Sequence, residues 1–195
     1  FANETGDVTF DQNPYWEINQ MKSFGFNYNM FDLKFPIAGK QLGITTGLGF
    51  GYHNYSLRNN YVLAHTADTI FAVQDTVFNF KSNKLQVGTI SIPLLLDYSF
   101  GKNFDKSYYM AVGVIGTYNY GTKQSLTGTY ANGDEFVNST ISAFNMNRWT
   151  LDATTRIGYG HFGMFISYQL NSMFKTGHTV AVYPFRIGFN ILFGI

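Results

Sequence analysis

Hydrophobic and polar residues alternate along most of this chain, and a period of two residues predicts β-strands. The last stretch is the clearest, because one face carries Tyr183, Phe185, Ile187, Phe189, Ile191 and Phe193 while Arg186, Gly188 and Asn190 occupy the other. The pattern recurs in about seven long stretches, at residues 24–37, 42–56, 86–100, 108–120, 149–159, 162–171 and 183–194. No amphipathic helix of useful length competes, so the pattern predicts an all-β fold.

Two local features interrupt the alternation. In the first stretch the phase slips at Met30 and Phe31, and one inserted residue in a strand is typical of a β-bulge. Pro36, Pro93 and Pro184 also fall inside predicted strands. Proline cannot donate a ladder hydrogen bond, so we expect each of them to mark a bulge or a lost bond.

The connections between these stretches predict an antiparallel up-and-down barrel. Short connections lie at 38–41, 101–106 and 160–161. Long segments at 57–83 and 121–141, and a leading segment at 1–22, all fall at the opposite end when the strands are counted up and down. Short turns at one end and long outer loops at the other are typical of outer-membrane barrels.

Composition indicates which face of the strands meets water. Charged residues make up only 13% of the 195 residues, whereas aromatic residues make up 18%. The polar face carries mostly Gly, Ser, Thr and Asn, where a soluble barrel would carry many Lys and Glu. Because the interior of an eight-stranded barrel is narrow, small polar residues fit it and rows of Phe, Tyr, Leu and Ile do not. We therefore expect the apolar face to point towards lipid.

Aromatic residues near both ends of the strands support this orientation. Two groups form the expected interfacial belts, namely Trp149, Tyr118, Tyr120 and Tyr183 near the long loops, and Tyr98, Tyr108 and Tyr159 near the short turns. No apolar run approaches the roughly 20 residues of a transmembrane helix. The net charge of +1 argues against a nucleic-acid partner, and the absence of Cys excludes thiolate chemistry.

Several segments resemble a known family, the eight-stranded outer-membrane β-barrels common in Bacteroidota, which include PorT-like proteins. The matching segments are SFGFNYNMFDLKFPI at 23–37, LGITTGLGFGYHNYSLRNN at 42–60, SNKLQVGTISIPLLLDYSF at 82–100, AVGVIGTYNYGTK at 111–123, WTLDATTRIGYGHFGMFISYQLNSMFKTG at 149–177 and VYPFRIGFNILF at 182–193. The resemblance implies an integral protein of the bacterial outer membrane, in contact with outer-membrane lipid and lipopolysaccharide and with outer-membrane or periplasmic proteins as partners. The family usually has a strand before the first of these segments. We expect that strand upstream of Phe1, with residues 1–22 as the remaining first outer loop of a single domain over 1–195.

Charged residues on the predicted inner face are the first candidates for function. Asp97, Asp152, Arg156 and Arg186 share this face, joined by Asp32 and Lys34 beyond the phase slip. A charge inside a narrow barrel must pair with an opposite charge or remain hydrated. These residues therefore predict a lumen ion-pair network that plugs and rigidifies the barrel. The alternative is a selectivity ring in a conducting pore, but eight strands leave little open bore.

Catalytic chemistry finds little support in the sequence. His53 lies on the inner face, but Ser56 falls on the opposite face, and nucleophilic catalysis needs hydroxyl and base within hydrogen-bond reach. None of the four His has the spacing of a metal site. We expect no enzyme activity, no catalytic or metal site and no cofactor. In the loop at 57–83, Thr69 and Thr76 stand in Asp-Thr-apolar patterns that resemble a Bacteroidota O-glycosylation signal.

These observations leave several functional hypotheses. The first is a non-enzymatic outer-membrane barrel that scaffolds or assists a cell-envelope assembly. The others are a narrow porin-like channel for small solutes, a lipid- or peptide-modifying barrel enzyme, and a soluble lipocalin-like carrier.

Overall fold

The structure, a computed structural model, consists of β-strands joined by turns and loops. It describes residues 19, 22–39, 41–57, 61–65, 70–74, 78, 80–101, 106–130, 133–176 and 181–191. The strands are β1 (Phe24–Ala38), β2 (Leu42–Leu57), β3 (Tyr61–His65), β4 (Ile70–Gln74), β5 (Phe80–Ser99), β6 (Tyr108–Thr129), β7 (Glu135–Ile141), β8 (Trp149–Tyr159), β9 (Phe162–Gln169) and β10 (Phe185–Ile191). In this part of the chain no helix is long and apolar enough to cross a membrane.

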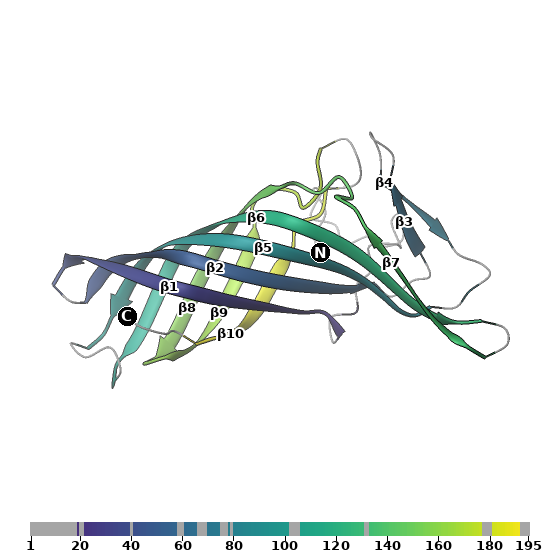
Figure 1. Cartoon of the computed structure of the whole chain (residues 1–195). Coiled ribbons are helices and arrows are strands. Elements are labelled where there is room, and N and C mark those ends of the chain that lie inside the picture. The colour runs from purple at the N-terminus through teal and green to yellow at the C-terminus, as the bar shows by residue number, and fades with distance from the viewer. Residues whose placement is uncertain are drawn as a thin grey trace.

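Eight of the strands form one curved antiparallel sheet (Figure 1). Its main path runs β1-β2-β5-β6-β8-β9-β10, and β7 pairs with the far end of β6. The seven strands of this path are the seven predicted stretches in the predicted order, so the all-β, antiparallel fold class is confirmed. Seven alternating strands leave β1 and β10 running in the same direction, and in the described residues the sheet stays open between them. A further antiparallel strand would be needed to close it.

The irregularities expected in the strands have different outcomes. The register between β1 and β2 shifts between Asn29 and Phe31 and again between Pro36 and Ala38, which confirms the bulge at Met30. Pro93 causes no register shift between β5 and β6. On the other side of β5, the pairing with β2 is interrupted between Thr46–Leu94 and Gly49–Ser91, which is where Pro93 would have its partner. Pro184 lies one residue before β10, so it removes no bond from that strand.

The long segments at the loop end are more regular than expected. Much of the predicted loop at 121–141 is a hairpin, because β6 continues to Thr129 and β7 returns along it. Within 57–83, β3 and β4 form a second hairpin, and β5 already begins at Phe80. We call the hairpin of β6 and β7, with the adjoining start of β5, the ledge (Figure 1). Within the ledge the outward residues of β6 are small or polar, such as Lys123, Ser125 and Thr127, so the hydrophobic alternation of this strand ends although the ladder continues.

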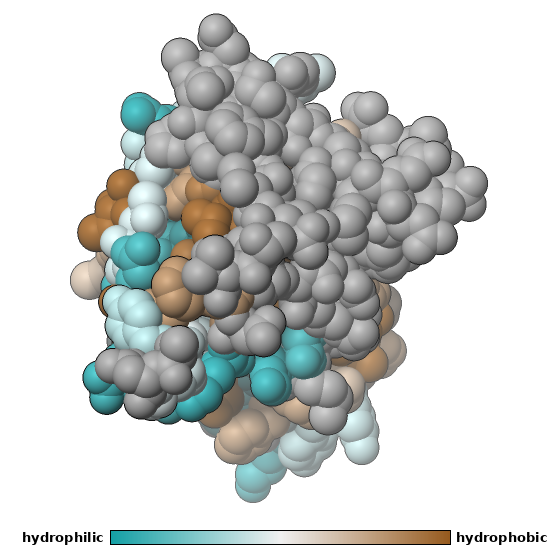
Figure 2. Space-filling view, turned by 90° about the vertical axis from the view of Figure 1, so that its right-hand side faces the viewer, coloured by the Kyte–Doolittle hydropathy of each residue, from teal (hydrophilic) through white to brown (hydrophobic). Residues whose placement is uncertain are grey.

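The two faces of the sheet differ as the alternation predicts. Large apolar side chains on the outer face remain exposed, and Phe189 reaches 81%. Inward positions are small or polar and buried, such as Thr45, Asp97 and Thr154. Seen from the loop end, hydrophobic side chains reach the flanks of the molecule (Figure 2).

The outward apolar band has the height of a membrane. Along β5 it runs from the row of Tyr52, Gly88 and Tyr120 near the loop end to Tyr98 near the turn end. Ten residue steps at ~3.4 Å, tilted by ~40°, span about 25 Å, which is the height of the lipid-facing band in outer-membrane barrels. Above that row the outward residues become polar, beginning with Asn54, Gln86 and Lys123.

Candidate functional site: a filled interior

The charged residues near the turn end form one group inside the curved sheet. The ammonium of Lys34 on β1 pairs with the carboxylate of Asp97 on β5 and lies 3.4 Å from the hydroxyl of Ser99. Asp32, two residues from Lys34, accepts hydrogen bonds of 3.0 and 3.2 Å from the side-chain amide of Asn29. Arg156 on β8 interacts electrostatically with Asp32 and Asp97. The partner of Asp97 in direct contact is therefore Lys34, and Arg156 acts on both acids.

A second group lies nearer the loop end. The guanidinium of Arg186 on β10 pairs with the carboxylate of Asp152 on β8, and it also hydrogen-bonds Tyr55 on β2. Because β2 and β10 lie near opposite ends of the sheet path, this bond spans the interior. The side chain of Asp152 is only 4% exposed, so its charge depends on Arg186 for compensation.

The sequence-predicted residues thus fall into two clusters. Asp152 and Arg186 belong to the loop-side cluster, while Asp97 and Arg156 belong to the turn-side cluster together with Asp32 and Lys34. Three acids face three bases across the two clusters, so the formal charges balance. A selectivity ring would present an excess of one sign to a passing ion, whereas here each ion pair joins two strands that are separated by one strand of the sheet.

His53 is held by packing. Its ring stacks on Tyr55, with centroids 6.4 Å apart and planes 22° apart. On the other side it fills the space that Gly25 leaves, since a Cβ on Gly25 would lie 2.5 Å from Nδ1 of His53. The ring is 7% exposed. This residue fills the barrel interior and ties β1 to β2.

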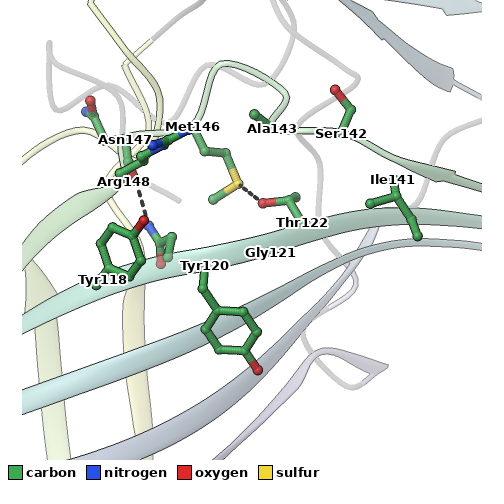
Figure 3. Close-up of a pocket in the computed structure, with 11 residues that line it drawn as sticks. Tyr118, Tyr120, Gly121, Thr122, Ile141, Ser142, Ala143, Met146, Asn147 and Arg148 are labelled. Carbon is green, nitrogen blue, oxygen red and sulfur yellow. Dashed lines mark hydrogen bonds between the residues drawn. The ribbon is translucent and has the colours of Figure 1, made fainter.

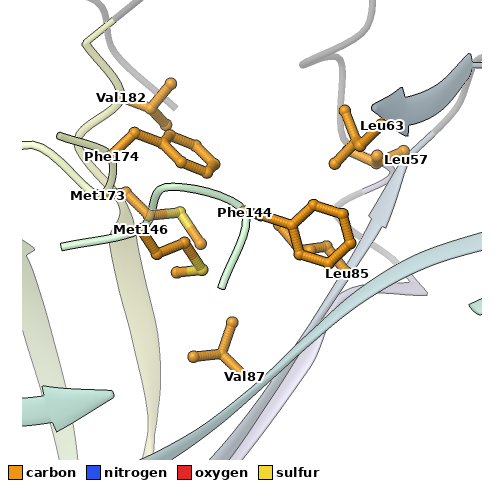
Figure 4. Packing of buried hydrophobic residues seen from close by; sticks show 9 residues of the cluster. All are labelled: Leu57, Leu63, Leu85, Val87, Phe144, Met146, Met173, Phe174 and Val182. Carbon is orange, nitrogen blue, oxygen red and sulfur yellow. The ribbon is translucent and has the colours of Figure 1, made fainter. Parts of the chain in front are cut away.

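A hydrophobic cluster covers the interior at the loop end (Figure 4). It joins the upper ends of β2 and β5 to β3 and to the connections that flank β8 and β9, and its members are Leu57, Leu63, Leu85, Val87, Phe144, Met146, Met173, Phe174 and Val182. Phe144 and Phe174 are fully buried. Sequence reasoning missed this cluster, because five of its nine members, from Phe144 to Val182, sit in connections that show no strand periodicity.

The connection between β7 and β8, residues 142–148, supplies two members of this cluster. Phe144 and Asn145 both have positive φ, at 43° and 46°, a left-handed conformation that side chains other than glycine adopt at a cost. The side-chain amide of Asn147 donates to the carbonyls of Ser172 at 2.7 Å and Phe174 at 3.0 Å. The hydroxyl of Thr122 on β6 contacts the sulfur of Met146 at 3.3 Å. These contacts hold the connection across the mouth of the barrel.

The same connection borders a pocket in the barrel wall (Figure 3). Along the edge of β6, β7 pairs no further than Lys123 and β8 begins at Tyr118, and the pocket of about 290 Å³ lies in the gap between them. Its lining includes Tyr118, Tyr120, Ile141 and Arg148. Sequence reasoning did not identify this pocket, because it arises where two strands share one edge of β6.

Some candidate residues lie elsewhere. Thr69 and Thr76, the predicted O-glycosylation sites, fall outside the described residues, as does His178. Among the described residues, no group of three or more His, Cys, Asp and Glu side chains could hold a metal ion.

Comparison with known proteins identifies a family but no single relative. A family model described as outer membrane protein beta-barrel domain matches residues 5–175. No curated protein and no solved structure matches the chain.

Proposed function

Because the chain belongs to the outer membrane protein beta-barrel domain family, we propose that it is a non-enzymatic scaffold or accessory subunit of a cell-envelope assembly. The observation that carries this proposal is the filled interior. Ion pairs lie against its wall at two levels, the hydrogen bond between Arg186 and Tyr55 spans it, and an apolar cluster covers its mouth. A barrel built in this way offers its rigid wall and its loop-end surface to partners.

The ledge is the surface best suited to contact a partner. At its tip four aromatic rings pack together, three of the contacts edge to face and the contact between Tyr130 and Phe136 tilted, with centroids 4.8 to 6.3 Å apart; the rings are Phe78, Phe80, Tyr130 and Phe136. Val137 on β7 is 70% exposed, and an edge strand of this kind can pair with a strand of another chain. The resemblance to PorT-like barrels of Bacteroidota supports partners among outer-membrane or periplasmic proteins. Because the ledge lies at the loop end, which faces outside, its own partner would be an outer-membrane protein.

Site-specific crosslinking tests this proposal. A photo-crosslinking residue placed at Val137, with the same residue at Lys106 near the turn end as a control, would be activated in native outer membranes before gentle solubilisation. We expect one stoichiometric envelope protein joined through Val137 and not through Lys106. Recovery of the barrel alone from both positions would contradict an accessory role.

The filled interior also separates this proposal from a porin-like channel. A covered lumen predicts no steady conductance for the wild-type protein in planar bilayers. Phe144→Ala removes a buried ring from the cover, so the conductance of this variant should be higher than that of the wild type. Steady openings of the wild-type protein would favour the channel instead.

A further inference from the structure

The outer wall carries a group of cations just above the lipid-facing band. Lys84 on β5 and Lys123 on β6 face outward, because each stands directly across from an outward residue, Ser125 and Gln86 respectively. The two lysines are diagonal neighbours on adjacent strands, a position within reach of long side chains. Both are half-buried against the wall.

Arg148 lies on the other side of the wall pocket. Its backbone carbonyl accepts a hydrogen bond of 2.8 Å from Asn119, which fixes it beside the start of β8, and its side chain is exposed. Next to it Trp149, 70% exposed, packs on Tyr118 with ring centroids 4.8 Å apart. Figure 3 shows Arg148 and the two tyrosines of β6 around the pocket.

Negative charge is scarce around these cations. On the described parts of β5, β6 and β7 above Gly88 the single acidic residue is Glu135, and Lys81 already donates to it at 2.6 Å. Residues 142–148 contain no acid. Among the described residues no side-chain ion pair joins Lys84, Lys123 or Arg148 to a carboxylate, so the patch has a net positive charge.

The height of the patch points to its ligand. Lys123 and Lys84 stand above the row of Tyr52, Gly88 and Tyr120 that ends the apolar band. Arg148, across from Asn119, stands about level with that row. Aromatic girdles of outer-membrane barrels lie at the lipid-water interface, and their longer loops face the outside. Lys84, Lys123 and Arg148 therefore stand at the level of the outer-leaflet headgroups, where clusters of basic residues attract anionic lipid.

We propose that Lys84, Lys123 and Arg148, with the pocket beside Arg148, bind the phosphorylated sugar headgroup of an outer-leaflet glycolipid. The planar guanidinium of Arg148 suits bidentate contact with a phosphate, and the lysines act as point charges. Tyr118 and Trp149 pack against the upper part of the acyl chains, while the open pocket of about 290 Å³ receives part of the sugar. Charge complementarity selects this ligand over a zwitterionic lipid.

The test measures binding of the purified full-length chain, held in zwitterionic nanodiscs, to bis-phosphorylated lipid A. The enzymatically dephosphorylated lipid and phosphatidylglycerol serve as comparison ligands, and native mass spectrometry provides the readout. At about 1 kcal/mol for each interfacial cation, the triple variant K84Q/K123Q/R148Q should lose on the order of 100-fold in affinity for lipid A. Lys106→Gln removes one charge at the turn end and should bind lipid A as the wild type does. The single variant R148Q also removes one charge, so the affinities of these two variants are compared directly.

Several outcomes would overturn the proposal. Equal binding of phosphorylated and dephosphorylated lipid would show that phosphate is not recognised. Equal binding of phosphatidylglycerol, or displacement by inorganic phosphate at the same concentration as lipid A, would show that the sugar headgroup is not recognised. An equal loss in K106Q and R148Q would show that total charge alone matters. The heat-dependent gel shift of a folded barrel checks that each variant has folded.

Discussion

The ring of Tyr120 lies across Gly88, so that a Cβ built on Gly88 would be 2.5 Å from Cζ of the tyrosine. This contact accompanies a bulge, because Gly88 pairs with Gly121 while Thr89 pairs with Asn119, which leaves Tyr120 as the extra residue of β6. The bulge lies where the strand leaves the lipid-facing band and continues into the ledge. It turns an additional aromatic side chain outward at this boundary.

Three glycine-to-alanine variants should therefore differ in cost. A Cβ at Gly121 would meet nothing within 4 Å, one at Gly88 would meet the exposed ring of Tyr120, and one at Gly113 would meet the backbone of Leu94 and Leu95. The exposed tyrosine ring can rotate away from a new methyl group, whereas the backbone of the paired strand cannot move without loss of its hydrogen bonds. We therefore expect Gly113→Ala to cost about 1–3 kcal/mol of stability and Gly88→Ala less. Gly121→Ala should be the mildest. Urea unfolding in lipid vesicles measures this order, and equal losses at Gly88 and Gly113 would contradict it.

Removing one member of the pair of Asp152 and Arg186 should lower the free energy of unfolding more than removing both. Arg186→Met leaves the buried carboxylate of Asp152 without its partner, which costs about 3–5 kcal/mol for a buried pair. The double variant Asp152→Asn/Arg186→Met removes both charges and should recover much of that loss. A double-mutant cycle by denaturant unfolding gives the coupling energy. Additive losses would mean that the two side chains do not stabilise each other.

The sequence predicted the strand path because lipid-facing strands require an apolar residue at every second position. The same reasoning placed Asp152 and Arg186 on one inner face, and the structure brings them together. It also placed Lys34 on the inner face beyond the slip at Met30, but it did not predict that Lys34 pairs with Asp97, since the choice of partner depends on the curvature of the sheet. It also took much of the ledge for loops, because strands such as 121–129 pair through their backbone and need no apolar face outside lipid.

The left-handed conformation of Asn145 predicts a clear dependence on residue type. With φ at 46°, glycine fits this position without strain and asparagine fits nearly as well, whereas a β-branched residue does not. Asn145→Gly should unfold within about 0.5 kcal/mol of wild type and Asn145→Val should lose about 1–2 kcal/mol. Denaturant unfolding of both variants in the same lipid provides the comparison. A valine variant as stable as the glycine variant would show that residues 142–148 adopt another conformation.

The pair of Lys81 and Glu135 predicts a pH dependence confined to the ledge. The hydrogen bond from Lys81, together with its positive charge, holds the pKa of the Glu135 carboxyl below its usual value of 4.5. A carboxyl whose pKa is lowered by folding adds stability at neutral pH, and this contribution is lost as the pH falls from 4.5 through the lowered pKa. In Lys81→Met the pKa of Glu135 should return to about its usual value, as measured by carbon-13 NMR titration of labelled glutamate. Because both side chains are exposed, the pair is screened by salt, so the wild-type pKa should rise towards that value in high salt. An identical pKa in wild type and Lys81→Met at low salt would show that the ion pair does not form in solution.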